Sequence, residues 1–124
     1  LWCVLGCGGD RDASKRPLMA AAAEAGADQV VLSSDNPRTE SPEAIVAAMV
    51  QGLSRPTKAL VQLDRALAIE GAVAQSAAQD VVLVAGKGHE SEQEIMGVRH
   101  PFSDVAQARR ALQQRAAQRQ GVLA

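Results

Sequence analysis

Three short apolar runs, each followed by a polar or glycine-rich loop, constrain the fold of this chain most strongly. The runs occupy residues 2–5, 29–33 and 80–85, and a weaker fourth run occupies residues 59–63. The first three are apolar on both faces, which is typical of strands buried in a parallel sheet. Because strand and helix patterns alternate, we expect an α/β fold in three layers. Its mostly parallel, Rossmann-like sheet should carry helices on both faces.

Helix signals separate or follow these runs, over residues 18–25, 42–53, 65–77 and 104–119. Capping residues precede the last three helices, and Pro17 and Pro42 suit a first helical turn. We expect the last helix to fray after residue 119. We expect it to bury one face, formed by Val105, Ala108, Ala111 and Leu112. Residues 93–96 and 98–100 flank Gly97 and predict a small antiparallel edge hairpin.

Composition argues against several classes of protein. Of the 124 residues, 47% are hydrophobic, which favours one folded domain. The net charge of −1 gives no field that would favour nucleic acid or an anionic membrane. The chain has no apolar run of membrane-spanning length and its start does not resemble a signal peptide, so we expect a cytoplasmic location. Cys3 and Cys7 fit neither a zinc site nor a redox pair, and we expect both to be reduced.

The loop after the second run carries the most specific chemistry. Asp35, Asn36, Pro37 and Arg38 place an amide and a guanidinium beside a proline of fixed φ. The planar fork of arginine matches a carboxylate. The same four residues are also ordinary turn formers, so this loop alone does not decide between binding and structure.

Two further loops follow the first run and the residue 80–85 run. Residues 6–12 form a glycine-rich turn that leads to Lys15 and Arg16, and it matches neither the Walker pattern nor the dinucleotide GxGxxG pattern. A phosphate site or a turn with solvated charges both remain possible there. In the later loop, His89 next to Glu90 makes a poor metal site. A base role for His89 is less favoured than a hydrogen bond that orients Glu90.

The carboxyl ends of parallel strands meet at one edge, so the three loops should converge there. Two guanidiniums, an amide, a backbone group and a carboxylate would then suit a zwitterion, such as an amino acid with a distal amino-carboxylate group. The residues expected to converge are Arg11, Asn36, Arg38, Gly86 and Glu90.

Arg65 presents a local conflict. It falls in the first turn of a predicted helix, where a cation is electrostatically unfavourable. This indicates a carboxylate partner, either Asp64 or another loop carboxylate. We expect the role of Arg65 to be mainly structural, with a solvated side chain as the alternative.

The three loops, in this order and spacing, resemble the C-terminal domain of the Mur ligases, and most closely the members that add meso-diaminopimelate. Further matches at Asp64-Arg65 with Ala68-Ile69, and at residues 101–104, extend the resemblance over nearly the whole chain. Glu92 departs from the pattern, because the family often has an aromatic residue there.

The resemblance implies that residues 1–124 are one domain, cut from a longer enzyme with N-terminal and central domains. Such enzymes use ATP and Mg²⁺ to join meso-diaminopimelate to UDP-N-acetylmuramoyl-L-alanyl-D-glutamate in cell-wall synthesis, through an acyl phosphate. The P-loop and most metal ligands belong to the central domain, so the resemblance implies no confident catalytic residue and no metal ligand in this chain.

By the same resemblance, Asp10 and Lys15 approach the nucleotide. The positions that match the meso-diaminopimelate site are Arg11, Asp35, Asn36, Pro37, Arg38, Gly86 and Glu90. Two alternatives remain open at this point: the domain of a sister ligase similar to folylpolyglutamate synthetase, and a non-catalytic α/β ligand-binding module.

Overall fold

The computed structural model describes residues 1–86 and 90–123. Four strands and three helices alternate through the first part of the chain, and a hairpin and a long helix complete it. In order, the elements are β1 (Trp2–Cys7), α1 (Lys15–Gly26), β2 (Gln29–Ser34), α2 (Pro42–Val50), the 3₁₀ turn η1 (Pro56–Lys58), β3 (Leu60–Val61), α3 (Arg65–Gln75), β4 (Val82–Ala85), β5 (Glu92–Ile95), β6 (Val98–Pro101) and α4 (Asp104–Leu123).

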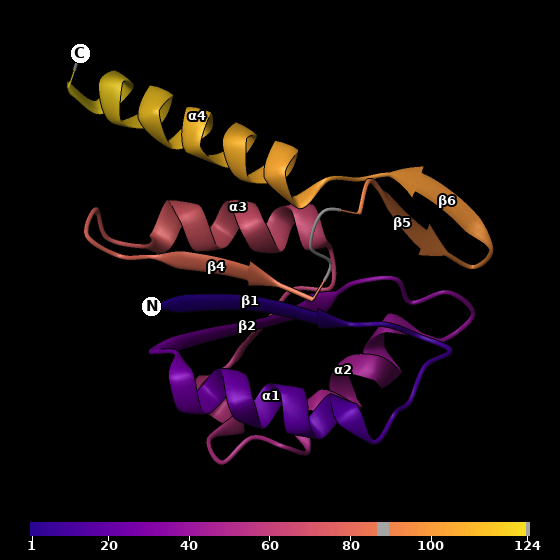
Figure 1. The fold of residues 1–124 in the computed structure, drawn as a ribbon. Coiled ribbons are helices and arrows are strands. Elements are labelled where there is room, and N and C mark those ends of the chain that lie inside the picture. Colours follow the sequence, from indigo (N-terminus) through magenta and orange to yellow (C-terminus); the bar gives the residue numbers. More distant parts are fainter. Residues whose placement is uncertain (87–89, 124) are drawn as a thin grey trace.

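The central sheet has the order β3-β2-β1-β4, and every pair in it is parallel. Figure 1 shows α1 and α2 on one side of this sheet and α3 and α4 on the other. The predicted three-layer α/β architecture is therefore confirmed. With the strands parallel, the loops that follow β1, β2 and β4 leave the sheet at the same edge.

Two apolar clusters hold the layers together, one on each face of the sheet. On the α1/α2 face, alternate strand residues meet the predicted apolar stripe of α2, which is Ile45, Val46 and Met49. On the other face, Val4 and Val31 pack against α3 and α4. Because successive residues of a strand point to opposite faces, β1 and β2 supply side chains to both clusters.

Some predicted boundaries were wrong. Strand β3 is only Leu60–Val61 rather than residues 59–63, because it lies at an edge of the sheet and pairs with β2 over these two residues alone. Helix α1 begins earlier than expected, at Lys15. Helices α2 and α3 each end a few residues early, at Val50 and Gln75.

Helix α4 also differs from expectation. Val105 and Leu112, predicted to face inward, are 53% and 57% exposed. The reason is that α4 packs mainly on α3 and touches the core through a narrow strip of small residues, Ala108 and Ala111. The helix also continues past residue 119, to Leu123. No helix within the described residues is long and apolar enough to cross a lipid bilayer.

The antiparallel hairpin β5–β6 is confirmed, and it forms a two-stranded sheet of its own. It lies beyond the carboxyl ends of the central strands (Figure 1). Backbone hydrogen bonds attach it to the β2 loop: Arg38 N donates to Glu94 O at 3.0 Å, and Met96 N donates to Arg38 O at 2.6 Å. The hairpin is thus positioned to contribute to any site at this edge.

Candidate functional site

Glycines let the backbones of the converging loops touch. A Cβ added at Gly9 would lie 1.8 Å from Pro37 O, and one added at Gly6 would lie 2.6 Å from Ser34 C. Gly86 has φ +106°, and a Cβ there would meet Gly6 O at 2.5 Å. These approaches leave no room for larger residues. The glycines therefore bring the β1 and β2 loops into direct contact and set the start of the β4 loop against the end of β1.

The β2 loop is buried and held from both sides. The side-chain amide of Asn36 accepts a hydrogen bond from Glu94 N at 2.8 Å and donates to Glu90 Oε2 at 3.1 Å. Gln93 donates from Nε2 to Asp35 O at 2.7 Å. Asp35, Asn36 and Pro37 are all buried. Asn36 therefore couples the β2 loop to the β4 loop and the hairpin at once.

Arg38 sits in the left-handed region, with φ +53°. Its Nη1 donates to Gly9 O at 2.8 Å and makes a longer contact with Asn36 O at 3.4 Å. Its Nε lies 3.9 Å from Glu94 Oε2, and the side chain is 20% exposed. A positive φ at a non-glycine residue is uncommon and is sustained here by the hairpin bonds on either side of Arg38.

A pocket of about 440 Å³ opens between this loop and the hairpin. Side chains of both charges surround it, together with an amide and a hydroxyl. They are Asn36, Arg38, Glu90, Ser91, Glu92, Glu94 and Arg99. A lining with guanidinium and carboxylate groups on facing elements suits a ligand that carries both an anionic and a cationic group.

The structure brings Asn36, Arg38 and Glu90 together at this pocket, as the sequence predicts. Gly86 lies against the end of β1, next to Gly6 O. Arg11 is exposed and lies beside Gly8, where a Cβ would be 3.5 Å from Arg11 Cγ and 3.0 Å from Arg38 Nη1. The two guanidinium side chains thus flank Gly8, although Arg11 is not among the residues that line the pocket. The interpretation of His89 lies outside the described residues.

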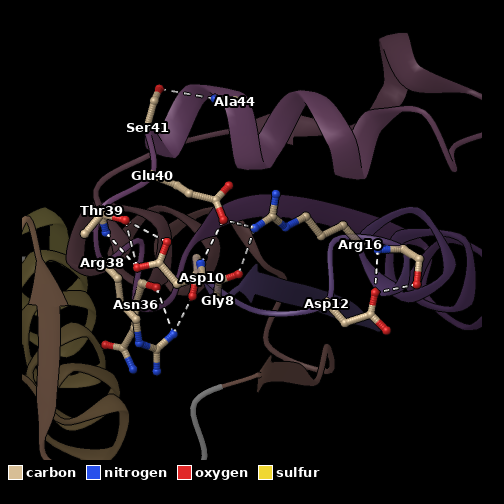
Figure 2. A network of polar contacts seen from close by, with 12 residues as sticks. Gly8, Asp10, Asp12, Arg16, Asn36, Arg38, Thr39, Glu40, Ser41 and Ala44 are labelled. Atoms are coloured by element: carbon tan, nitrogen blue, oxygen red, sulfur yellow. Dashed lines mark hydrogen bonds and ion pairs between the residues drawn. The ribbon is translucent and has the colours of Figure 1, made fainter.

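A second polar network, built on Asp10, Arg16 and Glu40, joins the β1 and β2 loops (Figure 2). Arg16 Nη2 donates to Glu40 Oε1 at 2.8 Å and to Gly8 O at 3.2 Å. Asp10 N also donates to Glu40 Oε1, at 2.8 Å, and Thr39 Oγ1 donates to the Asp10 carboxylate. The hydrogen bond from Arg16, followed by that from Asp10 N, lowers the pKa of Glu40.

Sequence reasoning missed the roles of Arg16 and Glu40. The sequence allows a turn with solvated charges at Lys15 and Arg16, but the Arg16 side chain is buried. Its hydrogen bond to Glu40 raises its pKa. In the structure Arg16 lies in the first turn of α1, where a cation is electrostatically unfavourable, as Arg65 does in α3. The sequence did not show this conflict, because the predicted helix begins at residue 18. Of the predicted nucleotide-side residues, Lys15 is exposed at the start of α1, and Asp10 adopts φ +54°.

The predicted partner of Arg65 exists, and it is Asp104. Two hydrogen bonds of 2.8 Å join the guanidinium to the two carboxylate oxygens. Asp64 instead caps α3, accepting from Leu67 N at 3.0 Å. Arg65 is 1% exposed, so the alternative of a solvated side chain was wrong.

The described residues contain no cluster of three or more His, Cys, Asp or Glu side chains suited to hold a metal ion. Cys3 and Cys7 are both free, as expected, and both are buried. Burial raises the pKa of each thiol.

Comparisons with known proteins show the family to which the chain belongs. The family model described as Mur ligase, glutamate ligase domain, matches residues 1–88. The UDP-N-acetylmuramoyl-L-alanyl-D-glutamate–2,6-diaminopimelate ligase of Pseudomonas aeruginosa is 57% identical over 112 residues, which cover 90% of this chain and 23% of that protein. The enzyme of the same name from Acidovorax sp. is 55% identical over 115 residues, covering 93% of this chain and 23% of its own length.

A solved structure of an enzyme with this name superposes with a TM-score of 0.88 at 52% identity, covering 93% of this chain and 24% of that chain. The chain thus spans about a quarter of the length of the proteins that it matches. With a family model that covers most of the chain and a fold that agrees throughout, the chain belongs to the Mur ligase family, in which it corresponds to the glutamate ligase domain.

Proposed function

We propose that this chain is the amino-acid-binding domain of an ATP-dependent ligase that adds meso-diaminopimelate to UDP-N-acetylmuramoyl-L-alanyl-D-glutamate. The observation that carries the proposal is the pocket in which Asn36, Arg38 and Glu90 meet. The names of the relatives, each of which specifies 2,6-diaminopimelate, favour this function over that of a folylpolyglutamate synthetase.

The distal end of meso-diaminopimelate carries one carboxylate and one ammonium group. Arg38, with Arg11 beside it across Gly8, would hold the carboxylate in a planar, charge-assisted contact. Glu90, whose carboxylate is oriented by Asn36 Nδ2, would pair with the ammonium group. Gly86 would contribute from the backbone, while Asp35 and Pro37 shape the loop.

This arrangement would reject lysine. Lysine has the distal ammonium group but lacks the distal carboxylate, so its binding would leave the Arg38 guanidinium without an ionic partner from the ligand. A site built around a polar contact discriminates strongly against an analogue that lacks the matching group. The specificity of the domain would therefore reside mainly in Arg38.

The proposal includes two preceding domains and a cytoplasmic location. ATP would activate the terminal carboxylate of the nucleotide-linked peptide as an acyl phosphate, and Mg²⁺ would offset the phosphate charge. The sequence contains no Walker loop, so the longer enzyme would have to provide it. Asp10 and Lys15 are the residues of this chain proposed to face the nucleotide. Alone, the chain would bind the amino acid and catalyse nothing.

An NMR titration of the chain tests the proposal, with meso-diaminopimelate in one series and L-lysine in the other. We expect amide shifts confined to the β1, β2 and β4 loops and the hairpin, and only with meso-diaminopimelate. Equal shifts with both amino acids would overturn the assigned specificity. If neither amino acid causes a shift, the same comparison is made by steady-state kinetics on the full-length ligase, where equal use of lysine would reject the proposal.

A further inference from the structure

Two motifs of the sequence take no part in the proposed pocket, yet they meet in the core. They are Asp64-Arg65, at the start of α3, and Pro101–Asp104, which leads into α4. Arg65 has one of the most buried large side chains of the described residues. Its guanidinium donates to Asp104 through Nε and Nη2, each at 2.8 Å. It also donates to two backbone carbonyls, Ser34 O at 3.0 Å and Ala85 O at 3.2 Å.

Those two carbonyls belong to the residues from which the site loops leave the sheet. Ser34 is the last residue of β2, directly before the loop that carries Asn36 and Arg38. Ala85 is the last residue of β4, directly before Gly86. β2 and β4 are not neighbours in the sheet, because β1 runs between them. The guanidinium therefore spans β1 and ties two strands that do not bond each other.

The third attachment, Asp104, fixes the hairpin. Asp104 is the first residue of α4 and follows β6 closely. Phe102 N donates to Ser91 O at 2.9 Å and so closes the base of the hairpin just before Asp104. The ion pair thus connects the start of α3 to the end of the segment that supplies Ser91, Glu92 and Glu94 to the pocket.

An apolar side chain would fill this position at lower electrostatic cost. Burying a charged pair removes both groups from water, and hydrophobic replacements of similar volume are often neutral or stabilising. The first turn of a helix is an additional unfavourable place for a cation. What arginine provides here is geometry, because its planar fork has donors at fixed angles and can hold a carboxylate and two carbonyls at set distances.

We propose that Arg65 and Asp104 form a positioning clasp that sets the separation of the β2 loop, the β4 loop and the hairpin, and thereby the affinity for the amino acid. Arg65 acts through the loops and does not touch the ligand. The part of this inference that concerns affinity rests on the proposed function, whereas the part that concerns loop spacing does not.

The test uses two clasp variants and one matched control. Asp104→Asn keeps the shape of the side chain but removes the carboxylate charge. Arg65→Lys keeps the positive charge but removes the planar fork of donors. Arg65→Lys also serves as the milder variant if Asp104→Asn fails to fold. The control is Arg115→Met. Arg115 also fastens α4 to α3, donating to Val73 O and to Ser76 Oγ at 3.0 Å, but it does so beside the amino end of β4, far along both helices from the site.

Loop spacing is measured first, in the chain itself, by hydrogen exchange at Glu94 N, which donates to Asn36 Oδ1. Amides of β1 report global opening and serve as the reference. In the clasp variants we expect exchange at Glu94 N to accelerate by about tenfold or more beyond any acceleration at the β1 amides. In Arg115→Met we expect the ratio of the exchange rates at Glu94 N and at the β1 amides to stay as in the wild type. If exchange at Glu94 N changes only as much as exchange at the β1 amides in all three variants, the proposal that Arg65 and Asp104 set the loop spacing is wrong, whatever the ligand is.

Affinity is measured second, in the full-length ligase. The clasp variants should raise the KM for meso-diaminopimelate by about tenfold or more, because small displacements of binding groups are costly, and leave the KM for ATP nearly unchanged. If the two KM values rise together, the clasp has only a structural role. If neither the wild type nor any variant uses meso-diaminopimelate, the proposed function is wrong. The hydrogen-exchange result would still show whether Arg65 and Asp104 set the loop spacing.

Discussion

Two regions at the same edge of the sheet use arginine in different ways. In the network of Asp10, Arg16 and Glu40, the Arg16 side chain is 7% exposed and meets a carboxylate at 2.8 Å. In the pocket of Asn36, Arg38 and Glu90, the Arg38 side chain is 20% exposed, and its contact with the Glu94 carboxylate is 3.9 Å. Both arginines also donate to carbonyls of the glycine-rich β1 loop.

The difference separates a charge used for architecture, at Arg16, from the charge that we propose binds the ligand, at Arg38. Arg16 already has a close, charged partner within the chain, so its binding capacity is used in joining two loops. Arg38 is oriented by a neutral carbonyl, Gly9 O, and keeps a loose ionic contact on the pocket side. A ligand carboxylate would therefore gain more at Arg38 than at Arg16, since it would add a charged contact of short range.

The largest effect is expected when the Arg38 guanidinium is removed from the pocket. Arg38→Ala in the full-length ligase should reduce the affinity for meso-diaminopimelate by about 2–5 kcal/mol, the usual penalty for truncating one member of a desolvated charge pair. Lysine, which has no carboxylate for Arg38, should lose little, so the preference for meso-diaminopimelate should disappear. Competition kinetics with the two amino acids measure this ratio.

Arg109→Ala is the matched control for that experiment, because Arg109 is exposed on α4. It removes the same charge from the protein without touching the pocket. An unchanged preference in Arg38→Ala, or an equal loss in Arg109→Ala, would contradict the role assigned to Arg38.

The next effect concerns the opposite charge in the same pocket. Glu90→Gln keeps a group that can accept from Asn36 Nδ2 but removes the charge that would pair with the distal ammonium. We expect a loss of about 1.5–3 kcal/mol in amino-acid binding, the usual contribution of a hydrogen bond to a charged group. Because lysine also carries that ammonium, both amino acids should lose affinity, whereas ATP binding should not change. Equal losses for ATP and amino acid, in isothermal titrations, would count against a direct ammonium contact.

How much of this could be read from the sequence depends on how local each feature is. Asp64 as a helix cap and the strand before Asn36 follow from neighbouring residues, and both were predicted. The need of Arg65 for a partner was also local, since it follows from the helix dipole. The identity of the partner was not, because Asp104 is 39 residues away and only the packing of α4 on α3 selects it.

The pocket shows the same limit. The residue types at Asn36, Arg38 and Glu90 suggested a zwitterion, but the attachment of the hairpin to Asn36 spans 58 residues and could not be inferred from spacing. Arg16 shows how a misplaced boundary hides a local signal, since its place in the first turn of α1 is known only once the helix start is moved from residue 18 to Lys15.

A third experiment disturbs the contact between the β1 loop and the β2 loop, which both regions share. Gly9 N donates to Asn36 O at 2.7 Å, and Gly9 O accepts from Arg38, so this residue of the β1 loop holds the β2 loop at two points. In Gly9→Ala the new Cβ would lie 1.8 Å from Pro37 O, and the loops must separate. We expect a loss of about 1–3 kcal/mol in unfolding free energy, typical of overpacking, measured by urea denaturation.

Gly26→Ala is the control, because a Cβ at this helix end meets nothing within 4 Å. It should leave stability unchanged or slightly improved, since alanine is the better helix former. If Gly9→Ala is equally harmless, the β1 and β2 loops are not in the close contact that both regions require.

The smallest effect tests whether the Asp10–Arg16–Glu40 network is architectural alone. The pKa of Glu40 is lowered, first by its hydrogen bond from Arg16, and the pKa of Glu24 is lowered by hydrogen bonds from the backbone amides of Ser54 and Arg55. A carboxylate with a lowered folded-state pKa stabilises the protein fully above the unfolded value of about 4.3, and this contribution is lost as the pH falls through the folded-state pKa.

Glu40→Gln and Glu24→Gln should each therefore lower the urea midpoint at neutral pH, by an amount that shrinks towards zero in acid. A deficit that stays constant from neutral pH into acid would show that packing, not charge, is lost. Glu24 lies near the carboxyl end of α1, bonded to the loop that follows α2, and does not line the pocket. The pair of variants therefore separates the two uses of charge. If Glu40→Gln weakens meso-diaminopimelate binding as much as Glu90→Gln does while Glu24→Gln does not, Arg16 also serves the ligand. The division between an architectural arginine and a binding arginine would then be wrong.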